Sequence, residues 1–253
     1  NERPRWSPDG KRLAYVSNRS GASQVWLMDA DGKNTRQVTK IATEASGVLY
    51  SPDGASLVFV SSVYPDCPDE VCNQKRLDAA SKSKVQARTY VSLLYRHWDH
   101  WDNGRRDHIF VVPVEGGTPR DLTPGPQDAP AYQLSGPDGY AVSPDGKELA
   151  FVRNTDPAPA TSTNNDIFVV PLEGGEPKRI TNNPAADTSP VYSPDKRYLA
   201  YRAQARPGFE SDRFRLLLHE RATGAVTSLT DSFDRWVTSL AWAPDSSRLF
   251  FTA

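Results

Sequence analysis

A five-residue phrase that occurs five times constrains the fold more than any other feature of this chain. Its copies are Trp6-Ser7-Pro8-Asp9-Gly10, Tyr50-Ser51-Pro52-Asp53-Gly54, Val142-Ser143-Pro144-Asp145-Gly146, Tyr192-Ser193-Pro194-Asp195-Lys196 and Trp242-Ala243-Pro244-Asp245-Ser246. Proline presets the backbone for a tight turn, Asp can hydrogen-bond its own backbone, and Gly accepts the positive φ that follows. The phrase therefore predicts a repeated turn between two strands.

A short apolar run follows each copy and predicts the second of these strands. The runs begin at Leu13, Leu57, Leu149, Leu199 and Leu249. The prolines of successive copies lie 44, 92, 50 and 50 residues apart, so the second interval spans two repeats. A period of about 40–50 residues with strand–turn–strand signals is typical of a β-propeller with one four-stranded blade per repeat.

We therefore expect an all-β fold, a β-propeller of four-stranded antiparallel blades with one helical insertion. The expected complete blades cover about 4–40, 46–123, 139–181 and 190–230, and 237–253 supplies half of a fifth. The insertion, 63–106, lies within the second blade. An incomplete propeller would leave an unpaired apolar edge, so we expect the chain to be part of a longer polypeptide.

Two copies of the phrase lack the turn glycine and carry Lys196 or Ser246 in its place. If this position needs a positive φ, each replacement costs about 1 kcal/mol.

Charge is balanced at −1, which argues against a nucleic-acid or membrane-surface partner. No stretch approaches the roughly 18 apolar residues of a membrane span, and nothing in the sequence calls for a cofactor.

The insertion opens with Cys67 and Cys72, the two cysteines of the chain. A structural zinc site needs four ligands, so the pair supports a local disulfide or no bond at all. We expect the disulfide, and with it an oxidising compartment.

The segment from Gln74 to about Trp98 has no Gly or Pro, and we expect one helix there that lies against the propeller. Its expected apolar face is Leu77, Ala80, Ala87, Val91 and Leu94.

The insertion ends in a run, 95–106, that is dense in aromatic and charged side chains, and three interpretations of it stay open. A metal site could use His97 and His100 with Asp99 or Asp102. A ligand-contact surface would use Arg96 for a carboxylate or carbonyl, the tryptophans for stacking and an aspartate for a cation. A structural plug would pair Arg96 with the aspartates and pack the tryptophans at the edge of the blade.

The turn phrase resembles the TolB-type propeller repeat. The cysteine loop, the helix and the run Leu93-Leu94-Tyr95-Arg96-His97-Trp98 resemble the propeller of secreted bacterial peptidases of the prolyl oligopeptidase family, in its dipeptidyl-peptidase and acylaminoacyl-peptidase branches. The resemblance implies a propeller that precedes an α/β-hydrolase domain, caps its active site and admits peptides. It also places the catalytic triad on that domain. The chain has no Gly-x-Ser-x-Gly motif, so we expect no catalytic residue in it.

In the dipeptidyl branch, carboxylates of a propeller insertion capture the α-amino group of the substrate. The resemblance therefore makes Glu70, Asp99 and Asp102 candidates for this role, with Arg96 and Trp98 as further peptide contacts. Two functions stay open: the substrate-selecting domain of a periplasmic or secreted serine exopeptidase, or a non-enzymatic propeller that binds proteins. The partners expected are a peptide and the chain's own hydrolase domain, and a homodimer stays open.

Overall fold

The computed structural model describes residues 1–91, 93–97, 99–131 and 139–253, and these are almost entirely strands and turns. Four antiparallel sheets of the described residues have four strands each, and two further sheets, one in the insertion and one near the C-terminus, have two strands each. Two compact units divide the chain, Asn1–Pro126 and Gln127–Ala253. The predicted all-β class, with four-stranded antiparallel sheets and an incomplete last one, is confirmed.

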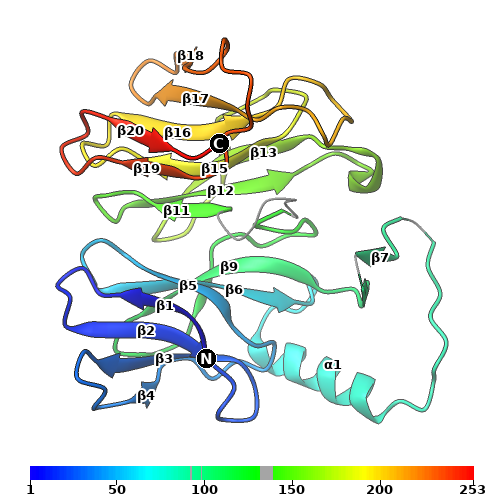
Figure 1. The fold of residues 1–253 in the computed structure, drawn as a ribbon. Helices are drawn as coiled ribbons and strands as arrows, with labels where there is room; N and C mark the ends of the chain where they lie inside the picture. Colours follow the sequence, from blue (N-terminus) through cyan, green and yellow to red (C-terminus); the bar gives the residue numbers. More distant parts are fainter. Residues whose placement is uncertain (92, 98, 132–138) are drawn as a thin grey trace. The chain divides into compact units, whose positions relative to one another are not determined.

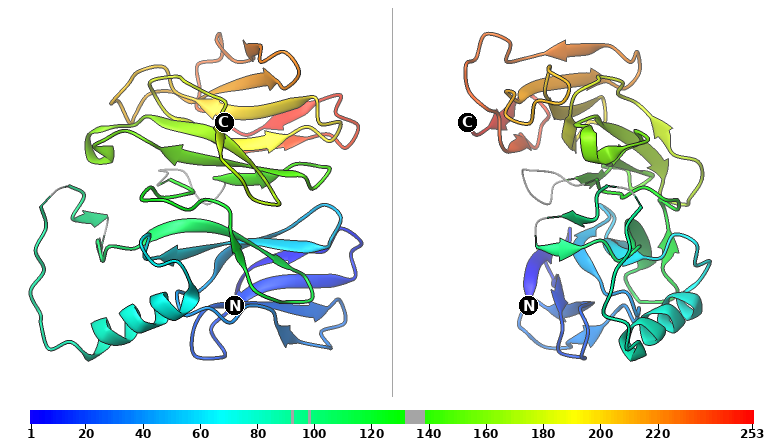
Figure 2. Two further views of the ribbon diagram at one scale, coloured as in Figure 1. Left: turned by 180° about the vertical axis from the view of Figure 1, so that it is seen from behind. Right: turned by 90° about the vertical axis from the view of Figure 1, so that its right-hand side faces the viewer.

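The first unit holds two of the sheets and the insertion (Figures 1 and 2). Its strands, in chain order, are β1 (Glu2–Trp6), β2 (Arg12–Ser17), β3 (Gln24–Asp29), β4 (Arg36–Gln37), β5 (Ser46–Tyr50), β6 (Ser56–Val63), β9 (Arg106–Pro113) and β10 (Arg120–Asp121). The sheet orders are β1-β2-β3-β4 and β10-β9-β6-β5. Buried aliphatic side chains of both sheets, among them Leu27 and Leu57, form one shared core. Burial of this apolar surface is the main force that holds the two sheets together.

The second unit holds the other three sheets. Its strands are β11 (Tyr140–Val142), β12 (Glu148–Asn154), β13 (Asn165–Pro171), β14 (Lys178–Arg179), β15 (Asp187–Tyr192), β16 (Tyr198–Ala203), β17 (Arg215–Glu220), β18 (Val226–Ser228), β19 (Leu240–Trp242) and β20 (Leu249–Phe251), with a short 3₁₀ turn η1 (Pro159–Thr161). Strands pair in chain order within each sheet. Apolar clusters around Leu199 and Leu216 pack neighbouring sheets together.

The repeated phrase forms the turn between the first two strands of a sheet. In the second copy, the Gly54 amide donates to the Ser51 carbonyl (2.8 Å), and the Asp53 carboxylate accepts from the Ser51 hydroxyl and the Ala55 amide. The Ser51 hydroxyl oxygen also accepts from the amide of Ser56, the first residue of β6. The serine, whose role was not predicted from the sequence, thus ties the turn to the following strand.

The edge strands β1, β5 and β15, each the first strand of its sheet in the chain, share a bulge that the sequence analysis did not predict. The pairing register shifts between Glu2 and Arg5 in β1, with corresponding shifts in β5 and β15. Within each bulge one residue has a positive φ: Arg3, Gly47 or Ser189. Such a bulge adds one unpaired residue and increases the local twist of the strand.

The predicted helix 74–98 is wrong at both ends, because α1 spans Glu70–Lys82. It begins earlier because the Asp69 side chain accepts a hydrogen bond from the Cys72 amide and caps the first turn. It ends at Lys82, and residues 83–89 are all exposed, so burial does not stabilise further helical turns there. Val85 is 74% exposed and Val91 is 97% exposed, and β-branched residues favour the helix only weakly.

The helix lies against the sheet only through its N-terminal part, since Asn73 is its one buried residue and the expected apolar face is largely exposed. Among the described residues, no helix is both long and apolar enough to cross a membrane.

Candidate functional site

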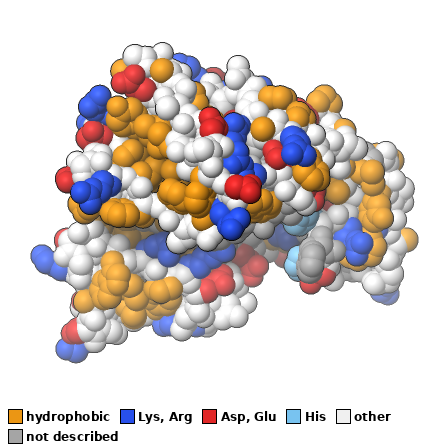
Figure 3. All heavy atoms as spheres, turned by 45° about the horizontal axis from the view of Figure 1, so that its top comes forward, with side chains coloured by type: hydrophobic (Ala, Val, Ile, Leu, Met, Phe, Trp, Pro, Cys, Tyr) orange, Lys and Arg blue, Asp and Glu red, His pale blue; other side chains and the backbone are white. Residues whose placement is uncertain are grey.

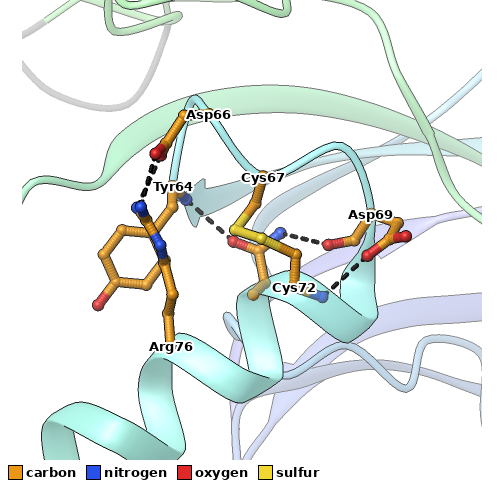
Figure 4. Close-up of a disulfide and its surroundings, with 7 residues drawn as sticks. Tyr64, Asp66, Cys67, Asp69, Cys72 and Arg76 are labelled. Atoms are coloured by element: carbon orange, nitrogen blue, oxygen red, sulfur yellow. Dashed lines mark hydrogen bonds and ion pairs between the residues drawn. A yellow bond between two sulfur atoms is a disulfide. The ribbon is translucent and has the colours of Figure 1, made fainter.

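The start of the insertion is a compact, cross-linked turn (Figure 4). A disulfide joins Cys67 and Cys72, whose Cα atoms are 5.4 Å apart. Arg76 forms a bidentate ion pair with Asp66 at 2.6 and 2.7 Å and lies over the ring of Tyr64. The side chain of buried Asn73 accepts from the Tyr64 amide, which joins α1 to the end of β6. These contacts fix the N-terminal half of α1 against the sheet.

Glu70 lies in the first turn of α1 and accepts a hydrogen bond from the Ala42 amide. Desolvation raises the pKa of this carboxyl, and the charge of neighbouring Asp69 raises it further, while the bond from Ala42 opposes the shift. A groove of about 1000 Å³ lies between α1 and the 40–42 segment, and Glu70 is one of its lining residues.

A small hairpin closes the insertion. Its strands are β7 (Arg96–His97) and β8 (His100–Trp101), with Arg96 paired to Trp101 and His97 paired to His100. All four residues are exposed, and Figure 3 shows histidine side chains at the surface on the right of the view. Among the described residues, the Arg96 guanidinium has no hydrogen bond or ion pair, so it is available to a ligand.

Three aromatic rings support the hairpin. The ring centroids of Tyr90, Tyr95 and Trp101 are 5.8–6.2 Å apart, and the Arg88 guanidinium lies 5.9 Å from the Trp101 centroid. The Tyr90 hydroxyl donates to the Asp102 carbonyl at 3.0 Å. The cluster therefore holds Arg88, Tyr90 and Tyr95 against β8.

The two aspartates of the hairpin have different surroundings. Asp102 accepts from the Gly104 amide at 2.8 Å and pairs with Arg106 at 3.3 Å, so its charge is largely balanced. Asp99 has one ion-pair partner in the described part of the chain, His100 at 3.1 Å, and both side chains are highly exposed. Of the two, Asp99 is the more accessible to a bound cation.

The structure thus brings Arg96, Asp99 and Asp102 together in one hairpin. It places Glu70 elsewhere, on α1, which the long 83–95 segment separates from the hairpin (Figures 1 and 2). Trp98 lies outside the described residues. The sequence analysis did not single out Tyr90, Tyr95 or Arg88, although the aromatic residues on both sides of Arg96 could have suggested a cluster.

The metal interpretation of this run has no support in the geometry. Within the ranges that the structure describes, no three His, Cys, Asp or Glu side chains are close enough together to hold a metal ion. His97 and His100 are cross-strand partners, but no third ligand in the described part of the chain completes such a set.

Comparison with known proteins relates the chain to peptidase propellers. Residues 1–64 match the TolB beta propeller domain family. Dipeptidyl-peptidase 5 of Porphyromonas gingivalis is 35% identical over 266 residues, which cover 99% of this chain and 36% of that protein. Dipeptidyl-peptidase 5 of Trichophyton equinum is 27% identical and covers 98% of the chain and 37% of its own length. The chain thus spans about a third of the length of these relatives.

Solved structures with the same fold include the acylaminoacyl peptidase of Pyrococcus horikoshii, with a TM-score of 0.68, 15% identity, and coverage of 99% of this chain and 35% of that one. TolB of Acinetobacter baumannii aligns with a TM-score of 0.58 and 17% identity over 96% of this chain and 47% of its own. At these identities the likeness concerns the fold. The chain therefore has a TolB-type propeller fold and is related in sequence to dipeptidyl peptidases.

Proposed function

We propose that this chain, a TolB-type propeller segment related over 99% of its length to dipeptidyl-peptidase 5, selects and gates peptide substrates for a serine peptidase of the prolyl oligopeptidase family. The observation that carries the proposal is the extent of this relationship, because it runs through the insertion as well as the propeller repeats. In this proposal the catalytic triad belongs to an α/β-hydrolase domain of the same polypeptide. The chain itself supplies contacts to the peptide.

The hairpin offers a chemically suitable contact surface. A peptide N-terminus presents an ammonium group and, next to it, a carbonyl oxygen. Asp99 can accept the ammonium group, since its present partner is an exposed histidine, and Arg96 can donate to the carbonyl. Asp102 and Glu70 already accept hydrogen bonds from backbone amides, so they are the weaker candidates. Trp98 stays a proposed contact from the sequence.

The proposed location is the periplasm or the cell exterior. The disulfide of Cys67 and Cys72 supports it, because such bonds persist in oxidising compartments.

Peptide hydrolysis by the full-length polypeptide that contains this chain tests the proposal. We expect release of dipeptides from peptides with a free N-terminus and little release from the same peptides after N-acetylation. Release of an acylated residue from the blocked peptides would instead indicate acylaminoacyl-peptidase activity. No hydrolysis of either set would contradict the proposal.

Substitution of Arg96 tests the role of the hairpin. A hydrogen bond to a charged partner contributes about 1.5–3 kcal/mol, so Arg96→Ala should lower kcat/KM about ten- to a hundredfold. Arg105→Ala, which removes the same charge nearby, is the matched control and should change little. If Arg96→Ala lowers the melting temperature while activity per folded molecule stays at wild type, Arg96 has a structural role only.

TolB-type propellers provide a second candidate function, a non-enzymatic module that binds protein partners. The fold likeness to TolB of Acinetobacter baumannii is the observation that favours it. The same hydrolysis assay separates the two, because this candidate requires no peptidase activity in the full-length polypeptide.

A further inference from the structure

The two faces of the β7–β8 hairpin carry different chemistry. Directly paired residues of antiparallel strands project to the same face of the sheet. Arg96 and Trp101 therefore share one face, while His97 and His100 share the other. The first face combines a cation that has no ion pair among the described residues with a large aromatic ring.

The aromatic cluster on this side is only partly covered. Trp101 is 50% exposed and Tyr95 is 43% exposed, although both rings pack against each other and against Tyr90. The adjoining residues Leu93 and Leu94 are 59% and 41% exposed. Exposed aromatic and aliphatic side chains that lie together on a protein surface often mark a binding site.

The polar groups around the cluster indicate what kind of ligand fits it. Asp99 precedes Trp101 by two residues and offers an anionic oxygen at the turn of the hairpin. Arg96 opposes Trp101 across the strands and offers donors. The N-terminal residue of a peptide carries an ammonium group, a side chain and a carbonyl group in close succession, and these three match the carboxylate, the aromatic surface and the guanidinium.

We infer that Trp101 and Tyr95 form the subsite for the side chain of the substrate's N-terminal residue, with a preference for aromatic and large aliphatic side chains. The inference rests on the proposed function, since it assigns a specificity to the same hairpin. Arg88, which lies over the Trp101 ring, and Tyr90 hold that ring in place and act as positioning residues.

The test uses the full-length polypeptide and three p-nitroanilide substrates, Gly-Ala, Leu-Ala and Phe-Ala, which differ only in the N-terminal residue. Wild type should prefer Phe and Leu over Gly. Because a buried aromatic contact is a typical binding hot spot, Trp101→Ala should lower kcat/KM for Phe-Ala by about tenfold or more and for Gly-Ala by less than about twofold. Trp101→Phe, which keeps an aromatic ring, should retain the order of preference.

Val85→Ala is the control, since it truncates another exposed apolar residue of the insertion, 74% exposed, outside the cluster. It should leave all three values unchanged. An equal loss on all three substrates in Trp101→Ala, with a lower melting temperature, would show that the cluster only supports the hairpin and would overturn the inference while the proposed function stands. Hydrolysis of none of the substrates by wild type would overturn both.

Discussion

At the scale of single residues, the turn position after Pro-Asp shows how strongly one dihedral angle constrains a sequence. Gly10, Gly54 and Gly146 have φ of 67–71° there, and Lys196 and Ser246 have φ of 67° and 62°. The sequence analysis expected a cost at Lys196 and Ser246 if this turn position needs a positive φ, and both residues have one. The five turns thus keep one backbone geometry whatever residue occupies the position.

Lys196→Gly should therefore stabilise the protein. Relief of the left-handed backbone is worth about 1 kcal/mol, and the exposed ion pair of Lys196 with Asp145 at 3.6 Å contributes less than that. We expect the free energy of unfolding to rise by about 0.5–1 kcal/mol in denaturant titrations. Gly146→Ala, at the same position of another turn, should lower it by a similar amount. A loss of stability in Lys196→Gly would contradict this account.

Asp187 is a buried carboxyl whose ionisation opposes folding. It is fully buried at the start of β15, Asn183 donates to its Oδ1 at 3.0 Å, and its Oδ2 has no hydrogen-bond partner in the described part of the chain. Desolvation raises its pKa to about 7. Between about pH 4 and 7 the folded state therefore holds a proton that the unfolded state releases, and stability falls as the pH rises through this range.

Asp187→Asn removes the charge but keeps the shape of the side chain. The variant should be more stable than wild type by about 2–4 kcal/mol above pH 7, and the difference should vanish near pH 4. Asp53→Asn is the control with the opposite sign, because hydrogen bonds from Ser51 and Ala55 lower the pKa of Asp53. Its destabilisation should be present at neutral pH and disappear in acid. Melting temperatures from pH 2 to 8 test both, and a pH-independent gain in Asp187→Asn would exclude the ionisation mechanism.

At the scale of secondary-structure elements, the strands could be predicted from the sequence, but a hydrogen bond that joins the end of each four-stranded sheet to its third strand could not. Each four-stranded sheet has a buried threonine after its last strand, whose hydroxyl accepts a hydrogen bond from an amide at or near the start of the third strand. The pairs are Thr39 with Val25, Thr123 with Ile109, Thr181 with Ile167 and Thr230 with Leu216. In the sequence these threonines cannot be told apart from ordinary strand residues. The repeated hydrogen bond is therefore recognised only when the amide that each hydroxyl contacts is known.

The insertion was harder to predict because its order depends on local cross-links rather than on a core. The apolar spacing from Leu77 to Leu94 suggested a long helix, yet α1 ends at Lys82 and the later members of that face, Ala87, Val91 and Leu94, are exposed. The neighbours of Arg96 depend on the register of a two-residue hairpin, which no periodic pattern encodes. Candidate residues could thus be named from the sequence, whereas the face of the hairpin on which each one lies depends on the three-dimensional structure.

Removal of the disulfide should loosen α1 without unfolding the sheets. A 13-residue helix is marginal on its own, and α1 buries a single residue, so the bridge and the Asp66–Arg76 pair supply much of its order. In a Cys67→Ser, Cys72→Ser double variant, we expect amide exchange in 70–82 to accelerate by about tenfold or more, while the melting temperature changes by less than about 2 °C.

Two measurements check this prediction. Hydrogen exchange read by mass spectrometry compares 70–82 with a strand such as β12 (Glu148–Asn154), which should be unaffected. Thiol titration of denatured, unreduced wild type should give close to zero free thiols. Two reactive thiols would show that the bridge is absent, and unchanged exchange in the double variant would show that it does not stabilise the helix.

At the scale of the whole molecule, the two-stranded β19–β20 sheet differs from the four-stranded ones. In the described residues β20 has one strand partner, β19, so its other edge presents free backbone groups. Phe250 is 57% exposed and Phe251 is 38% exposed beside this edge, and Phe251 packs edge-on against Phe233 at 5.5 Å. An apolar strand with a free edge is a template for pairing with another chain.

We therefore expect the 253-residue chain by itself to self-associate through β20 as its concentration rises. Phe250→Lys places a charge on this strand and should shift sedimentation profiles toward the monomer, because a charged side chain on an edge strand opposes strand addition. Val85→Lys adds the same charge to an exposed apolar residue away from the edge and should leave association unchanged. Equal suppression by both variants would indicate a general charge effect, and a wild-type chain that stays monomeric at high concentration would show that the β20 edge does not pair.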